Sequence, residues 1–311
     1  MFVDDQPRRV NRRAIWICAI QALWVWLFAL QLAAAELTFV HKGSWPGVSC
    51  GNYCAIERHQ GRLYLASNSL GGRAPGKLFL QEKPADGVYF APAIRPLIPQ
   101  IFAKFTDERG NPMDFVRTIG LASDGVTCHM LLNVGNDYGT DYYNYRPAYA
   151  SGPVCSELKY HGPITVDGRP QPRIFSSSMA YEVHGGRHYQ VHDGGCYGQG
   201  KLCLLASDDG LNYTTLAKDI WPWPNDRPAW PELSFCGGWW LVLANSQWER
   251  ETVKLIAAPS LEALVDGQVQ RYWLTNRFFK GINVMCDNGR LTGIHNRQRY
   301  ELDLSVLIRD R

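Results

Sequence analysis

The sequence has almost no helical periodicity and few of the patterns that mark a metal-binding or nucleic-acid-binding protein. No CxxC pair occurs in it, so its cysteines do not predict a zinc site. Lys and Arg number 32 against 29 Asp and Glu, which gives no electrostatic footprint for nucleic acid. No low-complexity tract or change of composition marks a second folded domain. We therefore expect one strand-rich domain with no nucleic-acid partner.

The first 35 residues have the pattern of a secretory signal peptide. Four arginines between positions 8 and 13 precede an apolar run over 14–32, and Ala33-Ala34-Ala35 then provides small residues for cleavage. We predict export to the periplasm or out of the cell, a mature domain over 36–311, and no stable membrane insertion after cleavage. A retained anchor is the alternative, because about 17 to 25 apolar residues suffice to span a bilayer.

Eight cysteines lie in the predicted mature domain. An even number in an exported chain favours disulfides, but the sequence alone leaves their pairing open. Cys196 and Cys203 flank a turn-rich stretch and are the first pair that we expect. The other expected pairs are Cys50–Cys54, Cys128–Cys155 and Cys236–Cys286.

At five places a short apolar strand runs into a glycine turn and then into a second apolar or aromatic strand. The turns are 51 to 64 residues apart, and in three repeats a third strand-like run begins 15 or 16 residues after the glycine. A hairpin repeated at such a period is typical of propeller blades, which bury their faces against one another. We predict an all-β fold, a monomeric five-bladed β-propeller of four-stranded antiparallel blades. The turn glycines are Gly61, Gly125, Gly186, Gly238 and Gly289.

Two stretches resemble elements of a known family. Ala206-Ser-Asp-Asp-Gly-Leu-Asn-Tyr213 is similar to the SxDG turn with a trailing aromatic residue in five-bladed propeller glycosidases of the arabinanase, xylosidase and fructosidase type. The stretch from Leu255 to Leu264 resembles the next blade's version of that element. The first stretch is also similar, more distantly, to the Asp-box of sialidase-like propellers. Because Asp and Gly close a tight turn, we expect these residues to act as scaffold.

The resemblance implies a carbohydrate site on the central axis, built from carboxylates on the innermost strands of different blades. Glycoside hydrolysis needs one protonated carboxyl group to assist the leaving oxygen, and one ionised group to activate water or attack. Glu232 lies just before the fourth hairpin, where the family keeps its general acid. Trp230 beside it could raise the pKa of this acid or stack on a sugar ring.

The second carboxylate is less clearly defined. The family's base lies on the first inner strand, but Asn52 stands in the corresponding stretch, and an amide cannot act as a base. Residues 175–181 of the third repeat contain no acid before the turn. Asp114, which precedes the second inner strand, is therefore the candidate base or pKa modulator. Asp193 is an alternative, in a sequence more typical of a turn.

Tryptophans are concentrated in 221–230, directly before Glu232. Exposed tryptophans there would form a sugar-binding platform, whereas buried ones would only lock the loop. An arginine trio for a sialic acid carboxylate, formed by Arg58, Arg117 and Arg227, is a further interpretation. The candidate substrate-binding residues are Trp221, Trp223, Trp230, Arg227 and Asn52.

The motifs require no cofactor, although one segment is compatible with calcium. Residues 136–144 combine acidic, amide and aromatic side chains, which could hold calcium or line a sugar groove; a solvated loop is the alternative. Three histidines at 184, 188 and 192 lack the nucleophile motif that a Ser-His-Asp triad needs.

Two functions remain open at this point. The first is an exported glycoside hydrolase in which Glu232 is the general acid and Asp114 the base or modulator. The second is a non-catalytic periplasmic or secreted propeller that binds a glycan or a protein, as an inhibitor or adaptor. The missing Asp of the first repeat favours the second function, while Glu232 and the tryptophan segment favour the first.

Overall fold

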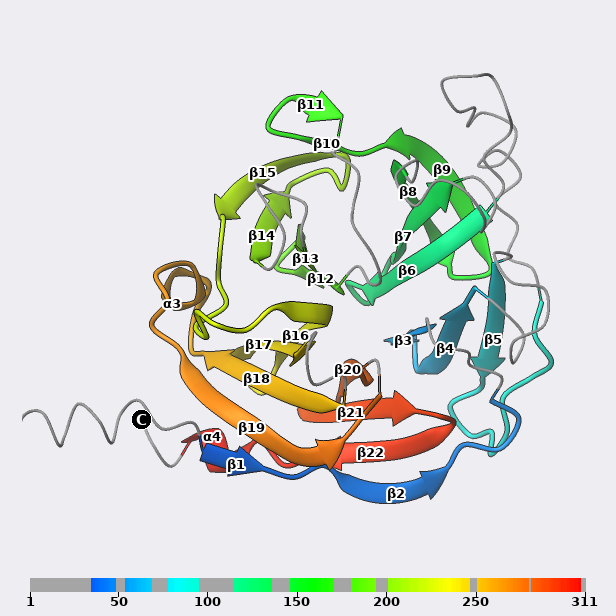
Figure 1. Ribbon diagram of the computed structural model, residues 1–311. Coiled ribbons are helices and arrows are strands. Elements are labelled where there is room, and N and C mark those ends of the chain that lie inside the picture. The colour runs from blue at the N-terminus through cyan, green and yellow to red at the C-terminus, as the bar shows by residue number, and fades with distance from the viewer. Residues whose placement is uncertain are drawn as a thin grey trace, which may run out of the picture. The chain divides into compact units, whose positions relative to one another are not determined.

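The computed structural model describes most of the predicted mature domain. The described residues are 35–48, 54–68, 78–94, 115–135, 146–170, 180–193, 201–246, 251–279 and 281–308. The chain divides between Ala35 and Glu36 into two units, and the propeller is the second of them, Glu36–Arg311. Five β-sheets surround a central axis in this unit (Figure 1). The prediction of an all-β, five-bladed propeller is confirmed.

Each sheet is one blade, and its strands are named from the innermost outward. Blade 1 contains β3 (Cys54–His59), β4 (Arg62–Ser67) and β5 (Phe79–Lys83). Blade 2 contains β6 (Phe115–Ser123), β7 (Cys128–Gly135), β8 (Arg146–Val154) and β9 (Glu157–Pro163). Blade 3 contains β12 (Ala180–His184), β13 (Arg187–Asp193), β14 (Leu202–Ser207) and β15 (Asn212–Ala217), with β10 (Thr165–Val166) and β11 (Arg169–Pro170) at its outer edge.

The last two blades recruit strands from the start of the domain. Blade 4 contains β16 (Pro228–Cys236), β17 (Trp239–Ser246), β18 (Thr252–Ala258), β19 (Gln270–Arg277) and, outermost, β1 (Ala35–Leu37). Blade 5 contains β20 (Asn283–Asp287), β21 (Arg290–His295), β22 (Gln298–Leu302) and β2 (Val40–Ser44). The short helices are α3 (Leu261–Val265) and α4 (Ser305–Ile308).

All five predicted hairpins join the first two strands of a blade. In four of them a two-residue loop has positive φ at both positions, as in Gln60 (48°) and Gly61 (79°), which is the conformation of a type I′ turn. Glycine is favoured there because its missing Cβ removes the steric penalty of positive φ. The hairpin of blade 2 closes instead between Ser123 and Cys128, with a longer loop. Glycine therefore recurs at the hairpins because the turn conformation requires positive φ.

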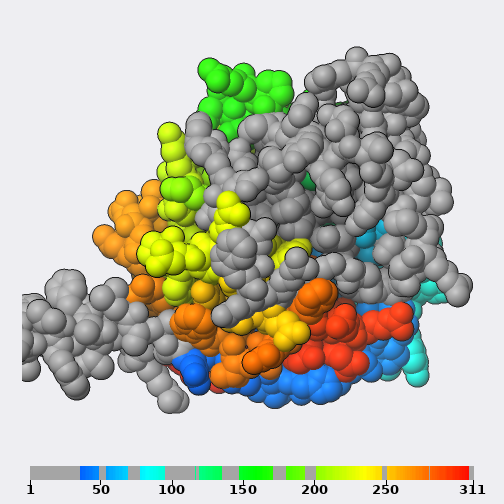
Figure 2. All heavy atoms as spheres, viewed as in Figure 1, coloured from blue at the N-terminus to red at the C-terminus, as the bar shows by residue number. Residues whose placement is uncertain are grey.

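Pairing of early and late strands closes the ring. The strand β2 pairs antiparallel with β22, with Val40 opposite Glu301, so blade 5 combines residues from both ends of the domain. Figures 1 and 2 show the blue β2 against the red strands of blade 5. The added β1 gives blade 4 five strands and the β10–β11 hairpin gives blade 3 six, while three strands are described in blade 1.

Two kinds of bond join neighbouring blades near the axis. The Arg58 guanidinium on β3 forms two hydrogen bonds of 2.9 Å to the Asp287 carboxylate on β20. A disulfide joins Cys236 of β16 to Cys286 of β20. Between the blades, the sheet faces pack as apolar clusters of buried side chains, such as Val116, Met130 and Leu132. The inner strands are therefore fixed at the centre of the domain.

Two of the expected disulfides are present among the described residues. They are Cys128–Cys155 and Cys236–Cys286. Cys54 and Cys203 are also disulfide-bonded. Their expected partners, Cys50 and Cys196, lie outside the described residues, so those two pairings stay predictions.

The turn that carries the family resemblance is a compact hydrogen-bonded loop. One carboxylate oxygen of Asp209 accepts main-chain N–H bonds from Leu211 at 2.8 Å and Asn212 at 2.7 Å. The Ser207 hydroxyl accepts the Gly210 N–H at 3.0 Å, and Tyr213 is buried behind the turn. These bonds hold the pKa of Asp209 below its usual value, against the effect of burial. The arrangement agrees with the scaffold role expected for this turn.

Candidate functional site

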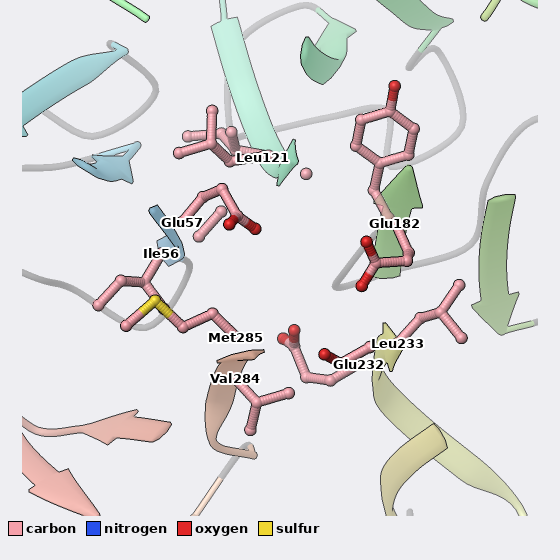
Figure 3. A pocket seen from close by; sticks show the side chains of 13 residues that line it. Ile56, Glu57, Leu121, Glu182, Glu232, Leu233, Val284 and Met285 are labelled. Carbon is pink, nitrogen blue, oxygen red and sulfur yellow. The ribbon is translucent and has the colours of Figure 1, made fainter. Parts of the chain in front are cut away.

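The innermost strands of the five blades line one pocket on the propeller axis. Residues of β3, β6, β12, β16 and β20 form its wall. Most of these residues are aliphatic, but three are glutamates. Figure 3 shows the side chains of Glu57, Glu182 and Glu232 directed toward the same central space. The pocket is thus a cluster of carboxyl groups within an apolar wall.

The strand registers place the three glutamates at two levels along the axis. Glu57 pairs with Tyr64 and Glu182 with Tyr189, two positions before the residue pair that closes each hairpin. Glu232 pairs with Leu243, four positions before the closing pair of its own hairpin. Side chains two residues apart on a strand point to the same face. Glu232 therefore faces the axis one level further from the hairpin turns than the other two.

Glu182 is supported by main-chain donors from two blades. Its carboxylate accepts the N–H of Val183 at 3.0 Å, and the N–H of Phe235 on the neighbouring β16 at 2.8 Å. Burial raises the pKa of Glu182 to about 7, while these two N–H groups favour the ionised form and limit the increase. Glu182 is therefore able to change its charge near neutral pH.

Glu232 has fewer donors and a stronger preference for the protonated form. Burial raises its pKa well above the usual value, and the Val284 N–H of β20 is the hydrogen bond that opposes this shift. The donor again lies on the inner strand of the next blade. A carboxyl group in this setting can deliver a proton at neutral pH.

Glu57 is coupled to Glu182 across the pocket. Burial raises the pKa of Glu57 well above its usual value, and the negative charge of Glu182 raises it further. The N–H of Arg58, 2.8 Å from the Glu57 carboxylate, acts in the opposite direction. Two nearby carboxyl groups in an apolar setting do not both ionise readily. Glu57 thus stays protonated when Glu182 carries the charge.

The pocket is narrow at the level of the carboxyl groups. The space open to the centre of a water molecule is about 20 Å³, which is room for about one water. Ile56, Leu121, Val284 and Met285 are among the aliphatic side chains that form the wall. A sugar ring therefore does not fit within this section in the present conformation, although a water molecule does.

The predicted site residues are only partly brought together. Glu232 lines the pocket, whereas Asn52 and Asp114 lie outside the described residues. Trp230 lies two residues from Glu232, in a bulge of β16, with a φ of 51°. Its indole N–H is buried without a hydrogen-bond partner among the described groups. Positive φ at a non-glycine residue is uncommon and often accompanies a functional site.

The other two tryptophans, Trp221 and Trp223, pack around the Asp226–Lys254 ion pair, outside the axial pocket. Trp221 is buried and its ring packs at a tilt against that of Trp223, with ring centroids 4.7 Å apart. The Trp221 indole N–H donates to Asp226 at 3.3 Å, and the Lys254 ammonium lies 2.7 Å from the same carboxylate. These contacts fix the 221–230 segment on blade 4. Trp221, Trp223 and the half-buried Arg227 are not among the residues that line the pocket.

Two glutamates of the pocket are missing from the sequence prediction. In the third repeat, residues 175–181 contain no acid, but Glu182 follows them directly and still precedes the turn. Glu57 and Glu182 both stand four residues before a turn glycine, Gly61 and Gly186. This shared spacing is the signal that could have identified both residues.

No metal site is evident in the part of the chain that the structure describes. Within it, no three His, Cys, Asp or Glu side chains form a group that could hold a metal ion. The segment 136–144, which was compatible with calcium, lies outside the described residues. In the same described part, no helix is long and apolar enough to cross a membrane.

Comparison with solved structures shows which proteins share this fold. An exo-β-1,3-galactanase from Phanerochaete chrysosporium with galactose superposes with a TM-score of 0.55 and 11% identity, over 86% of this chain and 65% of that chain. A GH32 β-fructofuranosidase from Bombyx mori gives 0.56 and 15%, over 85% and 62%. A GH43 protein from Bacillus licheniformis gives 0.50 and 11%, over 82% and 49%. The chain thus spans less than two thirds of the length of each.

These matches confirm the resemblance at the level of the fold. The chain shares its five-bladed propeller fold with these GH43 and GH32 proteins and with the galactanase. No protein-family model and no curated protein sequence matches it. Since identities of 11 to 15% do not transfer an activity, function must be argued from the pocket itself.

Proposed function

We propose that this chain is an exported glycoside hydrolase that acts on carbohydrate at the axial pocket, with Glu232 as the general acid. The observation that supports this proposal is the convergence of three glutamates from different blades on one axial pocket. Hydrolysis of a glycosidic bond requires two carboxyl groups in opposite protonation states. The pocket contains carboxyl groups whose different surroundings favour such states.

Glu232 suits the acid because burial favours its protonated form. Glu182 suits the base, because two main-chain N–H groups support its charge and its pKa of about 7 is lower than burial alone would give. In the proposed reaction Glu182 takes a proton from water as the water attacks the anomeric carbon. Glu232 gives its proton to the leaving glycosidic oxygen as the bond to that oxygen breaks.

The narrow section of the pocket fits the attacking water, and the sugar would lie at its mouth. Trp230, next to Glu232 along the chain, is the candidate stacking platform for the sugar. Trp221, Trp223, Arg227 and Asn52 remain candidates for outer contacts, and Asp114 remains a candidate second base. Glu57, kept protonated by its coupling to Glu182, can donate a hydrogen bond to water or substrate.

The test is a screen of purified mature protein on aryl glycosides and on oligosaccharides with poor leaving groups. The panel begins with β-galactosides and β-fructosides, since a galactanase and a fructofuranosidase share the fold. Loss of a general acid lowers rates by about 10²–10⁴-fold. We expect Glu232→Gln to lose much more activity on poor leaving groups than on nitrophenyl ones, which need little protonation.

The matched control is Glu157→Gln, because Glu157 is an exposed glutamate on β9. We expect this variant to keep wild-type activity on every substrate. Equal losses on good and poor leaving groups in Glu232→Gln would contradict the role of an acid. Sequencing the N-terminus of the secreted protein tests cleavage after Ala35 and separates a signal peptide from a retained anchor.

One observation favours the non-catalytic alternative, a secreted propeller that binds a glycan or a protein. At the level of the carboxyl groups, the centre of a water molecule can occupy about 20 Å³ of the pocket, which is room for about one water. If no substrate in the panel is cleaved, glycan-array binding by the mature protein would support this alternative. Under that outcome, Glu232→Gln should leave binding unchanged, because a narrow pocket would not contact the ligand.

A further inference from the structure

A disulfide joins two of the strands that line the pocket of carboxyl groups. It joins Cys236 on β16 to Cys286 on β20, with a Cα–Cα distance of 5.2 Å. These strands are the innermost strands of blades 4 and 5, and they belong to different sheets. No ladder of sheet hydrogen bonds therefore fixes their separation, and the covalent bond supplies that constraint.

The same two strands carry the main-chain donors of the pocket. Phe235, which immediately precedes Cys236, donates its N–H to Glu182 at 2.8 Å. Val284, two residues before Cys286, donates its N–H to Glu232. Both donors cross a blade boundary, so both hydrogen bonds depend on how far β16 lies from its neighbours. A shift of either strand changes the donor–acceptor distance and angle, and a hydrogen bond weakens steeply once its angle falls below about 120°.

We propose that the Cys236–Cys286 disulfide is a positioning element of the pocket, which holds β16 and β20 so that the Phe235 and Val284 N–H groups remain on the carboxylates of Glu182 and Glu232. The geometry of this proposal is independent of catalysis. Its consequence for a pH–rate profile rests on the proposed function. The two claims can therefore fail separately.

The experiment measures the titration of the glutamate side chains directly. Carbon-13-labelled glutamate is introduced, and Glu182→Gln and Glu232→Gln assign the two carboxyl signals. The titrations are then compared between wild type and Cys236→Ala/Cys286→Ala. Loss of a donor to the ionised form raises a carboxyl pKa. We expect the Glu182 and Glu232 transitions to move upward by about one pH unit, the effect of one weakened charge-assisted hydrogen bond.

The chain provides a matched control in Cys128→Ala/Cys155→Ala. This second disulfide is buried and lies within blade 2, and neither of its cysteines belongs to a strand that carries a donor to Glu182 or Glu232. Both double variants should lose thermal stability, since disulfides constrain the unfolded chain. Only the blade 4–5 variant should shift the two titrations. A shift of equal size in the control would show a general loosening and would overturn the proposal.

A second variant covers the case in which Cys236→Ala/Cys286→Ala does not fold. Cys236→Val/Cys286→Ala restores part of the buried volume without the covalent bond, and it should show the same upward shift. Wild-type pKa values for Glu182 and Glu232 in a folded variant without this disulfide would refute the positioning role. The titration needs no substrate, so a protein with no glycosidase activity still gives a decisive result.

Discussion

The carboxylate of Glu182 on β12 accepts the main-chain N–H of Phe235 on β16 at 2.8 Å, across the boundary between blades 3 and 4. A second N–H, that of Val183, donates to the same carboxylate at 3.0 Å. These donors partly compensate the loss of hydration, so the pKa of Glu182 rises only to about 7. The position of one inner strand thus controls the charge of an acid on the next.

This pKa predicts how stability depends on pH. The folded state holds the Glu182 proton up to a pKa of about 7, whereas an unfolded glutamate releases it near 4.3. Its contribution to stability is therefore present below about pH 4 and is lost as the pH rises through 7. In the wild type, this effect lowers the unfolding free energy between pH 4 and pH 8. In Glu182→Gln that decrease should be smaller by about 3 kcal/mol.

Denaturant unfolding at several pH values measures this change, with Glu157→Gln as the control for an exposed glutamate. Buried His188 and His192 affect the pH dependence of stability in the opposite direction to Glu182, because the pKa of each histidine is lowered to about 4. Their contribution is lost as the pH falls from about 6.5 to 4. The prediction therefore concerns the difference between variant and wild type, where the histidine effects cancel. An unchanged difference between pH 4 and pH 8 would contradict it.

The same groups predict the pH dependence of the proposed hydrolysis. The base Glu182 must be ionised, so kcat/KM should rise as the pH passes about 7. The acid Glu232 must be protonated, and because its pKa is raised well above normal, the falling limb should lie on the alkaline side. A pH–rate profile measured on an oligosaccharide tests both limbs. An optimum near pH 4 to 5, typical of exposed carboxyl groups, would contradict these roles.

The architecture could be predicted from the sequence because each hairpin is a local signal. Gly61 and Gly186 mark turns whose two central residues both have positive φ, and a strand-like apolar run lies on either side of each turn. The order of the blades then follows from the order of the repeats. Closure by β2 and β22 could not be predicted in this way, since it pairs segments from opposite ends of the domain.

The candidate site was harder to predict because it depends on register. Glu232 could be identified from its place before a hairpin, but Glu57 and Glu182 gain their role only when inner strands of different blades face one axis. Within Ala180–His184 alone, nothing distinguishes a glutamate at the axis from a solvated one. The spacing of Glu182 from Gly186 becomes a signal only when it is compared with the same spacing of Glu57 from Gly61 in another repeat. The Cys236–Cys286 pairing likewise joins two repeats, and the sequence offers it only as one of several possibilities because the contact between those repeats is not local.

The Asp226–Lys254 ion pair predicts a strong effect on stability away from the carboxyl cluster. The two side chains are only 8% and 7% exposed, and the Lys254 ammonium also lies 4.4 Å from the centroid of the Trp273 ring. Removing one partner leaves a buried charge, which costs about 3 to 5 kcal/mol. Asp226→Ala should destabilise the fold by this amount in denaturant unfolding.

Replacing both partners of this ion pair provides the control. Asp226→Leu/Lys254→Met removes both charges together, and it should be more stable than either single variant. If the double variant lost the sum of the two single effects, the charges would be independent and the interpretation of a buried pair would fail.

Gly210 and Gly125 have similar backbone conformations but different surroundings. Alanine variants at these two positions therefore separate the cost of backbone strain from the cost of steric overlap. Gly210 and Gly125 have φ values of 75° and 89°. A Cβ at Gly210 would lie 2.7 Å from the Tyr149 ring, while one at Gly125 would meet nothing within 4 Å. The Tyr149 ring cannot move easily, because it stacks on His161 and its hydroxyl bonds to His129 at 2.8 Å. Both alanine variants incur the cost of positive φ, about 1 to 2 kcal/mol.

Only Gly210→Ala adds an overlap with a fixed ring, which costs about 1 to 3 kcal/mol more. We therefore expect Gly210→Ala to lower the unfolding free energy by that much beyond Gly125→Ala, with disulfides kept oxidised during denaturant titration. Gly210 belongs to the turn of blade 3, and Tyr149 to β8 of blade 2, so the difference measures contact between blades. Equal losses in the two variants would mean that the blades yield at this boundary, and that the ring is less rigid than its hydrogen bond to His129 and its stacking on His161 indicate.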